Sequence, residues 1–297
     1  MKKYILISFF AMFFLSLSVM AQENEQGLYV APKTLFPYPQ APDTISSFQD
    51  RANYVVIRFW DRFDVSKPIQ DEVAFEQAFV DYLDFFPHAH KTVVMNSVKD
   101  FMNKAQSNKA NYMLIGKLAE KNLYSPQAVF ASDEAYMLFL ETMVNSSALK
   151  KKEKEYYKSQ MKKISRNAYG ALCPELVGVG LDGKKIKLSE HLCDKTTMLF
   201  FNDDESTNSM MSRLRLSTNV TFNNLISTGE LKIVCIVPKK YTPELASDVK
   251  AWADNWVIVM AEDVENIFDL KISPSVYILN EEKKIVEKNL PVEALLR

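Results

Sequence analysis

The chain has 297 residues, of which 47% are hydrophobic and 25% are charged, and its formal net charge is -1 at pH 7. These proportions are typical of a soluble protein of about two domains and exclude disorder over most of its length. Positive and negative charges are mixed throughout, so neither nucleic acid nor an anionic membrane is expected as a partner. Only 7 residues are glycine, and no glycine-rich phosphate-binding motif occurs. We therefore expect no cofactor.

The first 21 residues have the pattern of a cleaved secretory signal peptide. Lys2 and Lys3 precede an apolar run over residues 4–20, and the small residue Ala21 would lie at the cleavage site. Gln22 follows in place of the cysteine that a lipoprotein signal needs, so export to the periplasm or beyond is expected without a lipid anchor. An uncleaved membrane anchor is the alternative, although the run is short for a spanning helix. After cleavage we expect no membrane span.

Residues 22–149 are expected to form an extended lead-in and an all-α domain. The lead-in, 22–44, is polar and contains four prolines, which disfavour a packed element. From residue 45 to 149, apolar residues recur at steps of three and four, the period of an amphipathic helix. The predicted helices cover 46–63, 71–86, 91–106, 109–122 and 133–144. Residues 150–170 are highly charged and are predicted to form a solvated connecting helix that ends near Gly170.

The pattern changes after Gly170 to short β-rich runs that alternate with helices, which is typical of an α/β layer domain. Runs at 176–181 and 184–188 flank Asp182-Gly183, a strong two-residue turn signal, and predict a hairpin. Buried strands are predicted at 196–201, 231–237 and 256–260. Helices are predicted at 206–227, 243–253 and 264–270, and the last two strands at about 272–279 and 284–286.

This order resembles a thioredoxin-like domain of the kind found in bacterial envelope thiol–disulfide oxidoreductases, over about residues 171–297. In that group a strand and a loop ending in Asp-Cys-x-x-Cys precede a long helix, and a cis-proline loop precedes the closing hairpin. Residues 201–205 match the approach to the motif, and Ser206 and Ser209 fall on the two cysteine positions. Ser273-Pro274 falls on the cis-proline. The N-terminal half resembles a helical domain of unknown function that often precedes such domains. The implied fold is an α/β thioredoxin-like C-terminal domain, with a central sheet flanked by helices, behind an all-α domain.

The two serines change what the resemblance implies about activity. Thiol–disulfide exchange needs a thiolate, and a serine hydroxyl can neither attack a disulfide nor form one. Ser206 is instead well suited to cap the helix that begins there. A serine nucleophile would need an oriented base, and His191 is the sole histidine of this domain, with nothing in the sequence to orient it. We expect no catalytic residue and favour a protein that is not an enzyme.

The resemblance also implies a polypeptide-binding surface, because the proline loop of related domains contacts extended polypeptide. We expect a protein or peptide partner in the cell envelope, held by backbone hydrogen bonds near the degenerate motif. The candidate contact residues are Glu205, Thr207, Ser273 and Pro274. A structural subunit of an envelope complex is a further possibility.

The three cysteines leave an enzymatic alternative open. Cys173 and Cys193 flank the predicted hairpin nearly symmetrically, so antiparallel pairing would bring them near one end of the ladder, within possible reach of a disulfide. In the alternative function they serve as the redox pair of a thiol–disulfide oxidoreductase. Cys235 lies in an apolar strand and is expected to be a buried, inert thiol.

Two further groups are weaker candidates for a site. His88 and His90 could bind a metal with Asp84, but Pro87 interrupts the helical spacing that would align them, so we expect a surface turn and no metal site. Trp60, Asp61 and Asp64 form the second group. Trp60 lies on an apolar stripe and is expected in the core, and the two acids are expected to be solvated at a helix end, with an acid–base pair in a cleft as the alternative.

Overall fold

The protein is described here from a computed structural model, which covers residues 22–23, 29–30, 34–203, 205–252 and 254–296. The expected signal segment and Asp204 of the approach loop lie outside the described residues. Contacts between Cα atoms divide the chain into two compact units, with the division between Leu118 and Ala119. The boundaries expected at residues 45, 150 and 171 stay predictions. Among the described residues, no helix is both long and apolar enough to cross a membrane.

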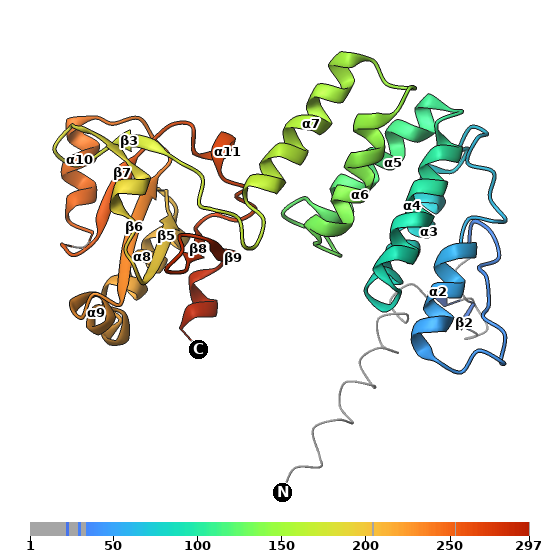
Figure 1. Ribbon diagram of the computed structural model, residues 1–297, viewed down its shortest axis with the longest axis horizontal. Coiled ribbons are helices and arrows are strands. Elements are labelled where there is room, and N and C mark those ends of the chain that lie inside the picture. The colour runs from blue at the N-terminus through green and yellow to red at the C-terminus, as the bar shows by residue number, and fades with distance from the viewer. Residues whose placement is uncertain (1–21, 24–28, 31–33, 204, 253, 297) are drawn as a thin grey trace, which may run out of the picture. The chain divides into compact units, whose positions relative to one another are not determined.

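The first unit is built mainly from helices (Figure 1). A short antiparallel pair precedes them, β1 (Gln22–Glu23) and β2 (Tyr29–Val30). The helices are α2 (Phe48–Arg58), α3 (Glu72–Asp84), the 3-10 turn η2 (Phe86–His88), α4 (Lys91–Ala105) and α5 (Lys109–Leu123), whose last residues belong to the second unit. Ser47 and Asp71 cap α2 and α3 by accepting the backbone N–H groups of Asp50 and Ala74.

An aromatic core holds the first unit together. The Trp60 and Phe101 rings stack with their centroids 4.3 Å apart, and Phe59 and Tyr82 lie against Trp60. Phe36, from the lead-in, is also buried among these rings. The predicted core position of Trp60 is thereby confirmed.

The second unit combines helices with a seven-stranded sheet. Its helices are α6 (Asp133–Asn145), α7 (Lys151–Arg166), α8 (Thr207–Ser217), α9 (Val220–Ser227), α10 (Pro243–Lys250) and α11 (Val264–Ile267), with the 3-10 turns η3 (Leu188–His191) and η4 (Val292–Leu295). Its strands are β3 (Val177–Val179), β4 (Lys185–Lys187), β5 (Thr196–Phe201), β6 (Leu231–Val237), β7 (Val257–Met260), β8 (Ser275–Leu279) and β9 (Ile285–Leu290). Figure 1 shows α9 and α10 outside this sheet.

The sheet is mixed, with the strand order β4-β3-β7-β6-β5-β8-β9. The central strands β5, β6 and β7 run parallel, and β8 pairs antiparallel with β5. Alternate residues of β5 face opposite sides of the sheet. Met198 and Phe200 belong to the core that includes Leu216 of α8 and Val249 of α10. Leu199 and Phe201 belong to the core on the other side, which includes Phe268.

Several helices differ from their predicted limits. The helix predicted over 206–227 is two helices, because Asn219 accepts the Phe222 N–H and caps α9 as a separate helix. The first predicted helix ends at Arg58 instead of residue 63, and turns follow it. Helix α7 ends at Arg166, although Gly170 does adopt a positive φ of 79°.

Candidate functional site

The candidate site lies where β5 leaves the sheet and α8 begins. The backbone N–H of Asn202 still donates to the Ile236 carbonyl of β6, at 3.0 Å, so the chain departs from the sheet directly after this residue. Ser206 has extended backbone angles and is the N-cap of α8. Its hydroxyl oxygen accepts the backbone N–H of Ser209 at 3.1 Å. The capping role expected of Ser206 is therefore present in the structure.

Asp203 is the centre of the site, because its carboxylate collects three serine hydroxyls. Its Oδ2 accepts the Ser209 hydroxyl at 2.7 Å, the Ser273 hydroxyl at 3.0 Å and the Ser206 hydroxyl at 3.3 Å. Its Oδ1 accepts the backbone N–H groups of Ser206 at 2.8 Å and of Glu205 at 3.1 Å. Both serines of the degenerate motif and the serine before the proline are thus bound to one carboxylate.

These hydrogen bonds keep Asp203 ionised. Partial burial of the carboxyl group by itself raises its pKa, but the hydrogen bonds from the Ser206 backbone, the Ser209 and Ser273 hydroxyls and the Glu205 backbone outweigh that effect. Together they hold the pKa of Asp203 well below its usual range. A carboxylate that is ionised at neutral pH accepts hydrogen bonds only, so the three hydroxyls point their protons toward it.

The expected contact residues differ in their accessibility. Ser206, Thr207 and Ser273 are exposed, whereas Ser209 is fully buried. Pro274 is also buried, and the peptide bond between Ser273 and Pro274 is cis. A ligand at this surface can reach the hydroxyls at residues 206, 207 and 273, but not that of Ser209.

Three charged side chains lie around the site. Glu205 was predicted from the sequence, whereas Lys239 and Arg213 were not. Glu205 pairs with Lys239, with 2.6 Å between its Oε1 and the lysine Nζ. The Arg213 guanidinium donates to the Asp203 carbonyl at 2.8 Å and lies 4.0 Å from the centre of the Trp252 ring. Ser209 lies three residues after Ser206, and Arg213 lies four residues after Ser209, which is the spacing of one helix face. This spacing is the sequence signal that could have identified Arg213.

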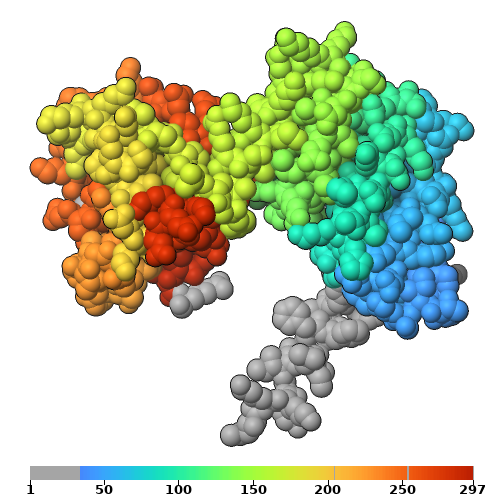
Figure 2. All heavy atoms as spheres, viewed as in Figure 1, coloured from blue at the N-terminus to red at the C-terminus, as the bar shows by residue number. Residues whose placement is uncertain are grey.

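Exposed apolar side chains continue from the site along α8. Met210, Met211 and Leu214 are 52%, 39% and 54% exposed. The neighbouring helix α9 adds Val220, which is also exposed, and Figure 2 shows this helix as the orange group at the lower left of the surface. Leu214 lies four residues after Met210 and three residues after Met211, so these side chains share one face of α8.

All three cysteines are free thiols in the structure, so the possible disulfide between Cys173 and Cys193 is not formed in it. The segments that contain Cys173 and Cys193 both contact Lys283. The Cys173 N–H donates to the Lys283 carbonyl at 2.9 Å, and the Lys283 ammonium group donates to the Cys193 carbonyl. Cys235 is buried, as predicted.

The other sequence candidates do not assemble into a site. In the part of the chain that the structure describes, no cluster of three histidine, cysteine or acidic side chains is arranged to hold a metal ion. His88 lies against the Phe48 ring, with 5.1 Å between ring centroids. Asp64 accepts the backbone N–H and the hydroxyl of Ser66, which gives it a local role in a turn.

Comparisons with solved structures identify the fold. A thioredoxin-like protein from Bacteroides caccae superposes with a TM-score of 0.75 and 23% sequence identity, over 89% of this chain and 97% of that one. The thioredoxin domain of a thiol-disulfide oxidoreductase from Bacteroides vulgatus is 19% identical over 44% of this chain and 99% of its own, with a TM-score of 0.36. A thiol:disulfide interchange protein from Bacteroides sp. is 20% identical over 43% of this chain and 85% of its own, with a TM-score of 0.36. The first of these likenesses confirms the predicted thioredoxin-like fold behind a helical region.

Comparisons of sequence concern mainly the helical region. No curated protein sequence matches the chain. The model of a family described as a domain of unknown function, DUF5106, matches residues 16–167. That match covers just over half of the 297 residues. The chain therefore belongs to the DUF5106 family, and it continues beyond that domain into a thioredoxin-like fold.

Proposed function

We propose that this is an exported, non-catalytic thioredoxin-like protein that binds a protein or peptide partner at the surface around Ser206, Thr207 and Ser273. The observation that carries the proposal is the binding of three serine hydroxyls to the Asp203 carboxylate. A thiol-dependent enzyme needs a thiolate at this helix terminus, and here the two positions are hydroxyls already engaged in hydrogen bonds. Hydroxyls at these two positions can take part in binding but cannot carry out thiol–disulfide exchange.

The exposed face of α8 supports binding of an extended polypeptide. Met210 and Met211 are unbranched and adaptable, and such side chains accommodate partners of varied sequence. The exposed hydroxyls at the start of the helix and in the proline loop can hydrogen-bond to a peptide backbone. Export rests on the signal-like pattern of residues 1–21 and places the partner in the cell envelope.

The competing function is thiol–disulfide exchange by Cys173 and Cys193. The contacts of Lys283 with both segments favour it, because they bring the two cysteines to a common neighbour. Burial, with a smaller contribution from the Glu175 carboxylate, raises the pKa of the Cys173 thiol to about 12. A thiol with that pKa supplies almost no thiolate at neutral pH, so binding without catalysis is the function that we favour.

A binding experiment with matched methionine variants tests the proposal. The probe is the insulin B chain with its cysteines blocked by carboxymethylation, and its affinity is measured by fluorescence anisotropy with the full chain. Met210→Asp should weaken binding about tenfold, because a charge on an apolar contact surface must be desolvated. Met95→Asp, on α4 of the helical unit and 45% exposed, is the matched control and should bind as the unchanged protein does.

Two results would contradict the proposal. The first is equal affinity of Met210→Asp and the unchanged protein for the B chain. The second is catalysed reduction of intact insulin by dithiothreitol that disappears in Cys173→Ser, which would establish the competing enzyme.

A further inference from the structure

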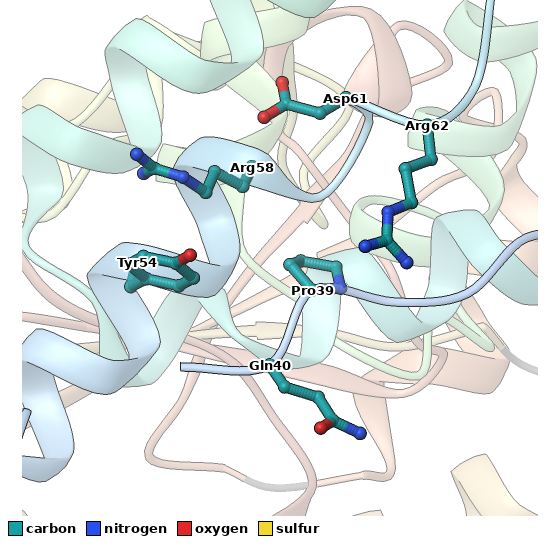
Figure 3. Close-up of a pocket in the computed structure, with 6 residues that line it drawn as sticks. All are labelled: Pro39, Gln40, Tyr54, Arg58, Asp61 and Arg62. Carbon is teal, nitrogen blue, oxygen red and sulfur yellow. The ribbon is translucent and has the colours of Figure 1, made fainter. Parts of the chain in front are cut away.

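A small pocket in the helical unit has the composition of an anion site. It has a volume of about 190 Å³ and is lined by Pro39, Gln40, Tyr54, Arg58, Asp61 and Arg62. Figure 3 shows Arg58 over the Tyr54 ring and Arg62 extending toward Pro39. Pockets for drug-sized ligands are usually about 300–1,000 Å³. This volume therefore suits a small ion or the charged end of a larger molecule.

The wall formed by Pro39 and Gln40 is held in place on both sides. On the N-terminal side of this wall, the Tyr38 hydroxyl donates to Asp81 of α3 at 2.6 Å. After it, the Arg51 guanidinium donates to the Ile45 carbonyl at 3.0 Å and to the Pro42 carbonyl at 3.4 Å. These contacts fix the lead-in against α2 and α3. The pocket therefore exists before any ligand enters, and this lowers the entropy cost of binding.

The opposite wall carries the charge. Arg58 is the last residue of α2, and its guanidinium lies 4.4 Å from the centre of the Tyr54 ring, which orients its planar group. Arg62 follows four residues later. Neither arginine forms an ion pair with any residue that the structure describes. The backbone N–H of Asp61 donates to the Arg58 carbonyl at 3.1 Å, so the carbonyl at the end of this helix is already satisfied.

We infer that this pocket binds a small oxyanion, a carboxylate or a phosphate group, with Arg58 and Arg62 as its cationic side chains. Two guanidinium groups and one carboxylate, that of Asp61, line it, so it has a net charge of +1. Planar guanidinium groups bind carboxylates and phosphates by paired hydrogen bonds. The site belongs to the helical unit and is independent of the peptide-binding surface proposed above.

Titration calorimetry of the full chain at low ionic strength tests the inference, with inorganic phosphate and succinate as probes. At least one probe should bind, and the tighter one identifies the chemical class. Arg58→Ala and Arg62→Ala should each weaken its affinity about tenfold, the effect of one charge-assisted hydrogen bond. Asp61→Asn should strengthen it, because a carboxylate that repels the anion is removed. Each of these side chains is exposed, so the variants are expected to fold.

The matched control is Arg166→Ala, which removes an exposed arginine from the last turn of α7, outside the pocket. It should bind the probe as the unchanged protein does. Absence of binding by both probes overturns the inference. It is also overturned by equal affinity of the Arg58 and Arg62 variants and the unchanged protein, or by an equal loss in Arg166→Ala.

Discussion

At the scale of single residues, Asp203 is the side chain on which the site depends. It accepts hydrogen bonds from three hydroxyls and two backbone N–H groups, and each donor would lose its partner in Asp203→Ala. We expect this substitution to lower the free energy of unfolding by about 2 kcal/mol, because hydrogen bonds to charged groups are stronger than neutral ones and this carboxylate is only partly buried. Urea denaturation measures the change. Asp248→Ala, an exposed acid on α10, is the matched control and should have almost no effect.

The stabilisation by Asp203 should depend on pH. Its pKa in the folded protein lies below the usual value of about 3.9 in an unfolded chain, so folding favours the ionised form. The contribution is fully present above that unfolded value and is lost as the pH falls toward the folded pKa. The free energy of unfolding of the unchanged protein should therefore exceed that of Asp203→Asn by a constant amount between pH 7 and 5. Below about pH 4 the difference should shrink.

Urea denaturation of both proteins at pH 7, 5 and 3 checks this expectation. A difference that stays the same at pH 3 would show that the charge of Asp203 does not contribute to stability.

At the scale of secondary-structure elements, a buried charge cluster joins the region around α6 to the end of the sheet within the second unit. Asp133, the first residue of α6, binds the ammonium groups of Lys271 and of Lys288 in β9. The Lys288 side chain is only 5% exposed and also lies 3.8 Å from Asp269. Asp269 in turn accepts the Tyr124 hydroxyl at 2.6 Å. Removal of one member leaves buried charges without compensation.

Asp133→Ala is expected to be among the most destabilising single substitutions in this unit. It deprives Lys271 of its carboxylate and leaves Lys288 only the more distant Asp269, and the loss should be about 3 kcal/mol in the free energy of unfolding. Adding Lys271→Met to that variant should recover part of the loss, because it removes the cation whose carboxylate is missing. Urea denaturation of the single and double variants measures both effects, with Glu141→Ala, an exposed acid on α6, as control. A loss as small as that of the control would contradict a stabilising role for the cluster.

Most elements could be predicted from local patterns, whereas the contacts of the site could not. The strands predicted at 196–201 and 231–237 agree with β5 and β6 to the residue, because each is an apolar run with polar residues at its ends. The division between α8 and α9 was missed because the apolar spacing continues past Asn219, although Asn is a favoured N-cap. Ser273 meets Asp203 across 70 residues of sequence. The spacing of apolar residues along the sequence does not indicate such a contact, because the contact depends on how β8 pairs with β5.

At the scale of the whole molecule, a thioredoxin-like fold carries serines at the two positions where the resemblance implies redox cysteines. If the surroundings still suit thiol chemistry, Ser206→Cys with Ser209→Cys should create a dithiol that reduces insulin in the presence of dithiothreitol. The N-terminus of α8 lowers a thiol pKa at position 206. Asp203, whose Oδ2 lies 3.3 Å from the Ser206 hydroxyl, opposes this because a nearby carboxylate disfavours a thiolate.

Adding Asp203→Ala to the two cysteine substitutions should therefore lower the thiol pKa and raise the rate of insulin reduction at neutral pH. The pH dependence of alkylation by iodoacetamide measures the thiol pKa, and insulin turbidity measures the rate. Both are compared in a background of Cys173→Ser with Cys193→Ser, so that the two native half-buried thiols do not contribute. An unchanged alkylation profile would mean that the carboxylate does not act on position 206. A faster triple variant would instead indicate that Asp203, together with the two serines, sets this surface apart from a redox site.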